Sequence, residues 1–373
     1  MNILVLFTYK VSVKDWNEAG IINREFELYK NLNKTNKFNY SFITYGDEND
    51  LIYNLDEFSI LPLYSKIKFS KSGIGNFYNS LRIIKIFKKE FQNADIIKTN
   101  QLNGAWVAVI AKIIYKKKLL IRTGYDLYYF SIKENKPLMK RYFFYLLTKL
   151  ALYFSDYYVV STSIDKARLV SRFGKRYNSK IKVNSNWVMT FEDVIPFHER
   201  KDQFISVGRL EEQKNYQNLV ELFSKTKYKL IIYGDGSEKD LIEEKARRLG
   251  SQLELKGSFD HKELLKEYEK YKYFVLNSHY EGNPKVVMEA MSAGCVVILR
   301  HHENNEEIIT SGENGIFYYK DEELLEVLNK IDQLNMKKIS DNARSYVKEN
   351  HLIEKHIKNE AELYKKLTSS NTL

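Results

Sequence analysis

Two glutamates, Glu281 and Glu289, flank the start of a short predicted helix in the C-terminal half of the chain. A buried strand pattern at residues 273–276 precedes this helix, and Asn283 with Pro284 marks its first turn. Such a helix points free N–H groups and its positive dipole end at the preceding loop, where open α/β sheets bind anions. Because carboxylates repel phosphate, two of them beside an anion site favour a ligand that also carries hydroxyl groups, such as a nucleotide sugar.

A structural interpretation of the same helix stays open. Gly294 ends the helix and residues 296–299 resume as a strand. An ordinary amphipathic helix would have the same pattern, with its apolar side chains in the core and Glu289 in solvent.

A second motif lies upstream. Residues 204–210 form a buried-strand pattern that ends in Gly208 and Arg209, and Lys214 follows in the loop before a helical segment at 216–223. Arg offers a rigid fork of donors and Lys a mobile charge, so the two together suit a diphosphate whose negative charge grows as it leaves. A strand pattern at 230–233 is followed by a Gly-Asp-Gly turn and another helical segment. This repeats the order of strand, turn and helix that is typical of a parallel sheet.

Four segments in this half resemble one known family. They read VGRLEEQKN, IIYGDGSEKDL, EGNPKVVMEAMSAG and EIITSGENGIF, and their order and spacing are similar to those of retaining glycosyltransferases of family four, over roughly residues 200–320. The resemblance implies an α/β protein with the GT-B fold, in which two Rossmann-like lobes each carry a parallel sheet and a cleft lies between them. It also implies a nucleotide-diphosphate-sugar donor held by the C-terminal lobe.

The resemblance assigns roles by position. Arg209 and Lys214 would grip the diphosphate, and Glu289 would accept hydrogen bonds from the ribose hydroxyls. Glu281 would touch hydroxyls of the transferred sugar near the reacting carbon. The backbone at Gly208, Gly282 and Asn283 would complete the pocket.

The N-terminal half departs from the family pattern. Gly20 stands where relatives often carry a glycine-rich loop that faces the donor phosphates, so the resemblance makes it a candidate donor-binding residue, and it is the single glycine there. Many relatives place a His before the glycine of the segment that here reads Arg122, Thr123, Gly124, Tyr125, Asp126, whereas this chain has Thr123 and no His before His198. Arg122, Gly124 and Asp126 are therefore candidate acceptor-side residues, although a simple surface pair of Arg122 and Asp126 is the alternative.

Retention of configuration needs no strong base if the departing phosphate oxygen takes the proton of the acceptor, as is often proposed for this family. Under that scheme catalysis is mainly positioning and electrostatics, and no metal or other cofactor is required. The sequence contains no zinc-like His or Cys cluster. His301 and His302 follow a strand end, either in solvent or lining the substrate.

Length supports two domains, because 373 residues exceed what one core usually supports. We expect an acceptor-side lobe at 1–195, a donor lobe at 196–350, and a last helix at 351–373 that crosses back to the first lobe. Cys295, the single cysteine, lies in an apolar run and is expected to be buried. No leader or spanning segment is evident, so we expect a cytoplasmic protein at the inner face of the cell membrane.

The charge is uneven. Residues 1–200 hold 32 Lys and Arg against 18 Asp and Glu, a net +14, whereas residues 201–373 hold 27 against 30, a net −3. Two segments of the basic half, 78–91 and 137–154, mix cations with large apolar side chains and are candidates for contact with an anionic membrane. Burial as core helices is the alternative for both.

The sequence therefore predicts a glycosyltransferase that moves a sugar to a lipid-linked saccharide or growing surface glycan. An epimerase or phosphorylase of the same fold is the closer rival, and release of nucleotide diphosphate only when an acceptor is present would separate a transferase from an epimerase. A nucleic-acid binder would explain the basic half and the 28 Tyr. It would leave the four motifs unexplained, so we expect no nucleic-acid partner.

Overall fold

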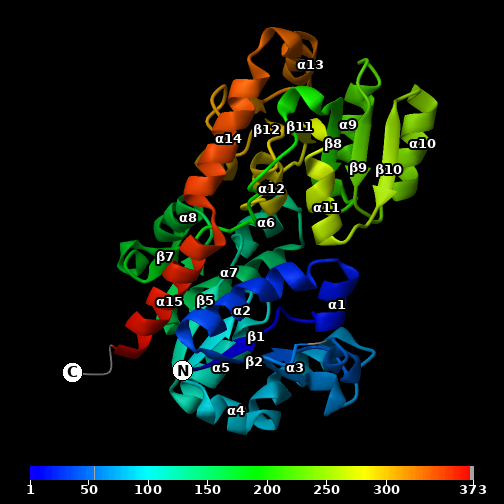
Figure 1. Cartoon of the computed structure of the whole chain (residues 1–373). Coiled ribbons are helices and arrows are strands. Elements are labelled where there is room, and N and C mark those ends of the chain that lie inside the picture. The colour runs from blue at the N-terminus through cyan, green and yellow to red at the C-terminus, as the bar shows by residue number, and fades with distance from the viewer. Residues whose placement is uncertain (54, 370–373) are drawn as a thin grey trace. The chain divides into compact units, whose positions relative to one another are not determined.

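Two parallel β-sheets organise the chain (Figure 1). The computed structural model describes residues 1–53 and 55–369 and divides them into two compact units. Unit 1 comprises Met1–Ser185 and the chain from Ile357 onward, and unit 2 comprises Asn186–His356. The first boundary therefore lies ten residues before the predicted 195, and the return to the first unit begins at Ile357 rather than at residue 351.

Unit 1 is built on a seven-stranded sheet in the order β3-β2-β1-β4-β5-β6-β7, and all its neighbouring strands run parallel. The strands are β1 (Asn2–Leu6), β2 (Asn39–Thr44), β3 (Ser59–Pro62), β4 (Ile96–Thr99), β5 (Lys118–Arg122), β6 (Tyr157–Val160) and β7 (Ile181–Val183). Its helices are α1 (Val13–Glu18), α2 (Ile22–Asn36), α3 (Gly73–Ile86), α4 (Lys88–Asn93), α5 (Ala105–Tyr115), α6 (Leu127–Lys133), α7 (Leu138–Phe154), α8 (Ser163–Phe173) and most of α15 (Ile353–Ser369).

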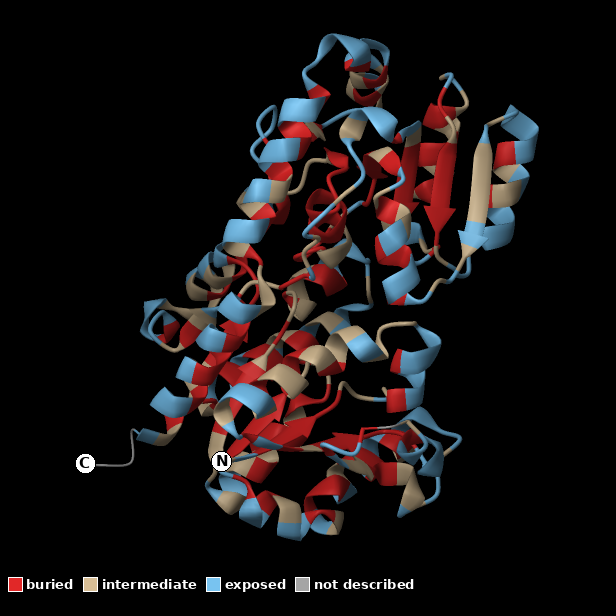
Figure 2. Ribbon diagram, in the orientation of Figure 1, coloured by how far each residue is buried: buried red, intermediate tan, exposed pale blue. Residues whose placement is uncertain are grey.

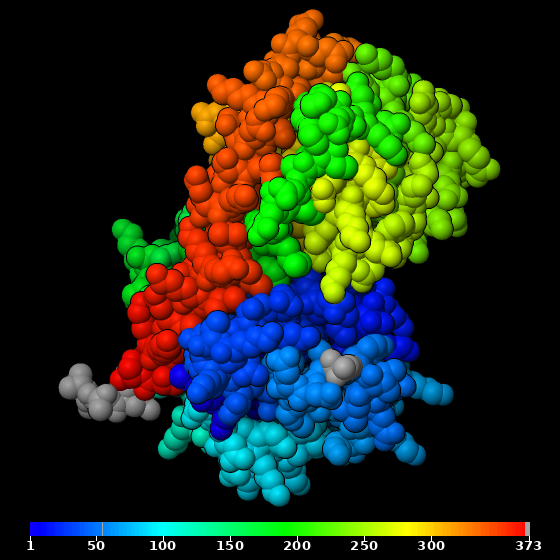
Figure 3. Space-filling view, viewed as in Figure 1, coloured from blue at the N-terminus to red at the C-terminus, as the bar shows by residue number. Residues whose placement is uncertain are grey.

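Helices cover both faces of this sheet, which is why its central strands are largely buried (Figure 2). On one face, Leu4 and Ile97 belong to a core that includes residues of α3, α4, α5 and α7. On the other face, β4 presents Lys98 to α2 and α15. Helix α15 lies on the surface of unit 1 as the red segment of Figure 3.

Unit 2 is built on a six-stranded parallel sheet in the order β10-β9-β8-β11-β12-β13. Its strands are β8 (Lys201–Val207), β9 (Leu230–Tyr233), β10 (Leu253–Gly257), β11 (Tyr271–Leu276), β12 (Val296–Arg300) and β13 (Ile316–Tyr318). Its helices are α9 (Tyr216–Phe223), α10 (Lys239–Leu249), α11 (His261–Tyr268), α12 (Lys285–Ser292), α13 (Asp321–Lys330) and α14 (Met336–Asn350). Alternation along β11 divides the core, because Phe274 packs with α11, α12 and α14 whereas Tyr273 packs with α9, α10 and α13.

Both sheets reverse their strand order once, between β1 and β4 in unit 1 and between β8 and β11 in unit 2. At such a reversal the loops that follow the two central strands diverge to opposite faces of the sheet. The crevice left at the carboxyl ends of those strands is the usual ligand site of an open α/β sheet. The topology therefore places the loops after β8 and β11 at the expected binding position of unit 2.

Most predicted elements are confirmed, with corrections at their ends. Helix α9 and strand β9 have the predicted bounds. Asn283 does not cap α12, whose N-cap is Pro284; the Asn283 Oδ1 atom instead accepts a hydrogen bond from the backbone N–H of Asn186. The segment 78–91 is not one helix but spans the end of α3 and the start of α4, which meet at Phe87.

Cys295 is fully buried, and burial raises the pKa of its thiol to about 12. It packs among apolar side chains of unit 2, as predicted for a structural cysteine. Within residues 1–53 and 55–369, no helix combines the length and apolar character needed to cross a bilayer.

Candidate functional site

Lys214 and Glu281 meet at the strand-order reversal of unit 2. Lys214 follows β8 and Glu281 follows β11, and their Nζ and Oε1 atoms lie 2.6 Å apart. Their side chains are 12% and 8% exposed, so the ion pair is largely shielded from water. A shielded pair of opposite charges at this position can hold an anion through the ammonium group and hydroxyl groups through the carboxylate.

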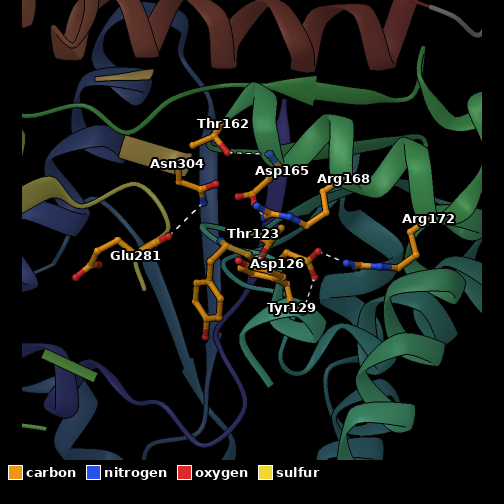
Figure 4. Close-up of polar contacts among 10 residues, drawn as sticks. Thr123, Asp126, Tyr129, Thr162, Asp165, Arg168, Arg172, Glu281 and Asn304 are labelled. Atoms are coloured by element: carbon orange, nitrogen blue, oxygen red, sulfur yellow. Dashed lines mark hydrogen bonds and ion pairs between the residues drawn. The ribbon is translucent and has the colours of Figure 1, made fainter. Parts of the chain in front are cut away.

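Three hydrogen bonds fix the two loops that carry this pair. The His279 N–H donates to the Gln213 carbonyl at 2.8 Å, and Gln213 Nε2 donates to the Tyr280 carbonyl at 2.9 Å. On the other side, Asn304 Nδ2 donates to the carbonyl of Glu281 at 3.3 Å (Figure 4). The backbone around Glu281 is thus held by residues from the loops after β8 and β12.

Two glycines let the neighbouring loops approach closely. At Gly208 an added Cβ would lie 3.0 Å from the Tyr216 hydroxyl and 3.1 Å from Lys214 Cε. At Gly234, whose φ is +150°, it would lie 1.9 Å from the Gly208 carbonyl oxygen. Side chains at either position would displace the loop that carries Lys214, which gives the predicted pocket residue Gly208 a steric role.

Arg209 is not brought together with Lys214. Its side chain is 71% exposed and pairs with Glu211, with 3.0 Å between Nη1 and Oε1. A long exposed side chain can reorient at little cost, since surface ion pairs contribute little to stability. Gly282 and Asn283, in contrast, are buried in the loop between β11 and α12.

Glu289 is buried inside unit 2 rather than solvated, so the interpretation of α12 as a simple amphipathic helix with Glu289 in water is wrong. The residue is 1% exposed, and its Oε1 lies 2.9 Å from Nε2 of His261, the first residue of α11. A buried carboxylate needs hydrogen bonds to remain charged. His261 supplies one of them and fixes the orientation of Glu289.

His302 is the second histidine that the structure brings into this region. The residue follows β12, and its Nε2 contacts the carbonyl of Ser278, in the loop after β11. Burial lowers the pKa of His302, and the nearby charge of Glu281 opposes this effect. His301 instead stacks on Tyr319 and pairs with Glu306 at the surface. The two adjacent histidines therefore differ, with His302 beside Glu281 and His301 directed away.

A buried polar network supports the ends of β11 and β12. Asn277, fully buried at the end of β11, donates from Nδ2 to Asn218 Oδ1 at 2.6 Å and accepts at Oδ1 from the Tyr318 hydroxyl at 2.8 Å. Arg300 Nη1 lies 3.3 Å from the same Oδ1. These bonds join α9, β12 and β13 to the end of β11, the strand whose following loop carries Glu281. The site is therefore supported by helices and strands.

The predicted residues of unit 1 lie at or near the carboxyl edge of its sheet. Gly20 follows α1 and has a φ of 68°, a backbone conformation that favours glycine. The Gly124 N–H donates to Gln101 Oε1 at 2.8 Å, and the backbone of Arg122 exchanges hydrogen bonds with the Thr99 hydroxyl.

Asp126 has a structural role. It caps α6 by accepting from the Tyr129 N–H at 3.0 Å, and its other oxygen lies 2.7 Å from Arg172 Nη1 (Figure 4). The residue is 3% exposed. Both oxygens are engaged within unit 1, which does not support Asp126 as a base. The alternative of a simple surface pair is wrong, because the carboxylate is buried.

His261 and His302 are the residues that sequence reasoning missed or left undecided. His261 follows Asp260, which caps α11, but nothing in the sequence relates it to Glu289 28 positions later. In the described ranges, no three His, Cys, Asp or Glu residues gather as a metal-ligand set.

Comparison with known proteins gives a consistent result. Residues 190–350 match the family described as Glycosyl transferases group 1. The chain is 26% identical, over 87% of both sequences, to the GalNAc-α-(1→4)-GalNAc-α-(1→3)-diNAcBac-PP-undecaprenol α-1,4-N-acetyl-D-galactosaminyltransferase of Campylobacter jejuni.

Solved structures share the fold at low identity. Sucrose-phosphate synthase from Thermosynechococcus elongatus aligns over 100% of both chains with a TM-score of 0.81 and 16% identity. Anabaena HepE, solved in complex with UDP, aligns over 98% of this chain and 100% of its own with a TM-score of 0.72 and 15% identity. The α/β fold of two lobes, each with a parallel sheet, is therefore GT-B as predicted.

Proposed function

We propose that the chain, which matches the glycosyltransferases of group 1 over residues 190–350, transfers a sugar, with retention of configuration, from a nucleotide-diphosphate-sugar to a glycan acceptor. The observation that carries this proposal is the shielded Lys214–Glu281 ion pair at the β8/β11 reversal. It combines a cation for a phosphate with a carboxylate for sugar hydroxyls, which is the pairing that a nucleotide sugar requires.

In this proposal the donor diphosphate lies beside Lys214, with the N-terminus of α12 directed at the same loop. Arg209 reorients from Glu211 to the diphosphate when the donor binds. Glu281 accepts hydrogen bonds from the sugar, and Glu289, oriented by His261, accepts them from the ribose. The backbone at Gly208, Gly282 and Asn283 shapes the pocket.

The proposed chemical step needs no protein base. The bond between the anomeric carbon and the diphosphate oxygen breaks, and the acceptor oxygen attacks from the same face. The acceptor proton passes to the departing phosphate oxygen. Lys214 and Arg209 stabilise the charge that grows on the leaving group, so the proposal includes no metal ion.

We propose that the acceptor is a lipid-linked saccharide or a growing surface polysaccharide, made at the inner face of the cell membrane. The name of the Campylobacter jejuni relative, which includes a PP-undecaprenol-linked glycan, supports this class of acceptor. The UDP bound in the Anabaena structure supports a nucleotide donor. Unit 1, which carries most of the basic N-terminal residues, is the proposed acceptor side.

A thermal-shift series with UDP, GDP and ADP, each with and without EDTA, tests the donor site. A ligand at a hundredfold its Kd stabilises the fold by about 2.7 kcal/mol, which such a measurement resolves. We expect a shift with one nucleotide that EDTA does not remove, and a smaller shift for Glu289→Ala. The absence of a shift with all three would contradict the proposed donor site.

A second assay separates transfer from the rival activities. Release of nucleotide diphosphate is expected only when an acceptor glycan is present. An epimerase would change the donor sugar without an acceptor, and a phosphorylase would require inorganic phosphate. Nuclear magnetic resonance of the anomeric proton of the product would show whether configuration is retained.

A further inference from the structure

The outer faces of α3, α5 and α7 form one continuous surface in unit 1, which we name the α3–α5–α7 surface. Aromatic contacts join the three helices, since the ring centroids of Phe77 and Trp106 lie 5.2 Å apart and those of Trp106 and Phe143 lie 5.9 Å apart. Phe77 belongs to α3, Trp106 to α5 and Phe143 to α7. The surface is therefore a single packed layer rather than three separate helices.

This surface exposes an unusual number of large apolar side chains. Along α7 they recur with helical spacing on the face opposite its buried residues, and Ile74 and Met139 are 85% and 87% exposed. The exposed apolar residues are Ile74, Phe77, Tyr78, Ile113, Ile114, Leu138, Met139, Tyr142, Phe143, Leu146, Leu150 and Tyr153. Contiguous exposed patches of this kind mark interaction sites.

The charge of the same region has one sign. The helices α3, α5 and α7 together hold six Lys and Arg with no Asp or Glu. Several of these cations, including Lys85, Lys140 and Lys149, are exposed beside the apolar residues. The partner must therefore be both apolar and negatively charged.

We propose that the α3–α5–α7 surface docks on an anionic lipid bilayer, with its aliphatic and aromatic side chains in the acyl boundary and its cations at the headgroups. Charge complementarity decides the partner. A second copy of the chain would bring two surfaces of the same positive sign together, which opposes association. A nucleic acid would match the charge but not the aliphatic residues Ile74, Leu138 and Met139, which offer bases no stacking platform.

The orientation of the helices connects this surface to the carboxyl edge of the sheet. Helices α5 and α7 precede the parallel strands β5 and β6, so their N-termini lie at that edge. Tyr9, which follows β1, contacts Trp106 at 5.0 Å between ring centroids. A bilayer under the surface therefore approaches the strand ends of unit 1. Delivery of a lipid-linked acceptor there rests on the proposed function, whereas the docking itself does not.

Vesicle sedimentation of the full chain tests the proposal. The probes are vesicles of phosphatidylglycerol mixed with phosphatidylcholine, and vesicles of phosphatidylcholine alone. We expect binding to the anionic vesicles that falls as salt is added, and little binding to the neutral ones. Equal binding to both vesicle types, or no binding to either, would overturn the proposal.

Two double variants separate the apolar and charged contributions. Leu138→Ser with Met139→Ser, and Lys85→Glu with Lys149→Glu, are each expected to weaken binding to anionic vesicles at least about tenfold. All four side chains are exposed, so the thermal midpoint should not change. The matched controls lie in unit 2, where Leu241→Ser with Leu249→Ser and Lys239→Glu with Lys348→Glu should leave vesicle binding unchanged.

Other occupants would give distinct results. Tighter binding to single-stranded RNA than to anionic vesicles, lost in both double variants, would make the surface a nucleic-acid site and overturn the proposal. A dimer in sedimentation velocity that Leu138→Ser with Met139→Ser dissociates would make it an interface between copies. Nucleotide thermal shifts report on the donor site and not on the α3–α5–α7 surface, so failure of the docking proposal is distinguishable from failure of the proposed function.

Discussion

Lys214 and Glu281, 67 positions apart in sequence, form a largely shielded ion pair with 2.6 Å between Nζ and Oε1. The pair bridges the two loops that diverge where the strand order of unit 2 reverses. Each of the two side chains holds the other in place, and each is also a proposed ligand contact. We therefore expect removal of either side chain to affect both stability and activity.

Glu281→Gln keeps the shape of the side chain but leaves the Lys214 ammonium without its counter-charge. We expect the free energy of unfolding to fall by roughly 2 kcal/mol, because a charged hydrogen bond is lost in a shielded place. We also expect kcat to fall more than the apparent affinity for the donor nucleotide. Urea unfolding and steady-state kinetics measure the two effects. Unchanged kcat in a folded variant would contradict the proposed role of Glu281.

Glu289→Ala should act on nucleotide binding more than on turnover. The buried carboxylate is proposed to contact the ribose, and His261 orients it across 2.9 Å. We expect a higher Kd for the nucleoside diphosphate with a smaller change in kcat, measured by calorimetry and initial rates. His261→Gln should have the same effect in weaker form, because glutamine retains a donor. Equal losses of kcat and affinity in the Glu281 and Glu289 variants would count against the two assigned roles.

Lys98 and Glu360 form a fully buried ion pair that ties α15 to the sheet of unit 1, and Tyr364 and Asn184 complete its hydrogen bonds. Lys98→Met leaves a buried carboxylate without its cation, so we expect a loss of about 3–5 kcal/mol. Lys98→Met combined with Glu360→Leu should recover most of that loss, since no buried charge remains. Denaturant unfolding of both variants gives the comparison. A double variant no more stable than the single one would exclude this explanation.

Asp126→Asn tests the structural role of a residue that the sequence offered as a catalytic candidate. The substitution weakens the contact with Arg172 and the cap of α6, so we expect a loss of roughly 1–2 kcal/mol in stability. The pH dependence of the rate should keep its shape, because both carboxylate oxygens are engaged by the α6 cap and by Arg172. Arg172→Met is the matched control and should reproduce the stability loss. A shifted pH profile in Asp126→Asn alone would restore the catalytic interpretation.

The stability of the chain should fall as the pH is lowered below about 6.5. Burial lowers the pKa of His302 below its ordinary value of 6.5, so the unfolded chain takes up the proton first. The contribution of neutral His302 to the free energy of unfolding is fully present above the pKa that this histidine has in the unfolded chain. It is lost as the pH falls toward the lower pKa of the folded chain. His302→Gln should flatten this dependence in part, because His351 has a pKa shifted in the same direction. An identical pH dependence in wild type and variant would contradict the prediction.

The strand and helix order of unit 2 was predictable because local signals agree with the fold there. Residues 216–223 and 230–233 combine apolar periodicity with glycine turns, and both elements have the predicted bounds. The capping of α12 was not predictable, since the Asn283 side chain bonds to Asn186, a residue 97 positions away. Local propensity favours Asn at a cap, but a long-range contact of similar strength overrides it.

Residue type and spacing identified Lys214, Glu281 and Glu289 as candidate site residues, because those types in that order suit a phosphate-bearing sugar. The tertiary structure alone decided how they are used. It joined Lys214 to Glu281, set Arg209 at the surface with Glu211, and placed His261 on Glu289. In unit 1 it turned Asp126 into a buried cap. Sequence specifies which charges exist and which elements carry them, whereas the burial and partners of each charge depend on contacts between distant segments.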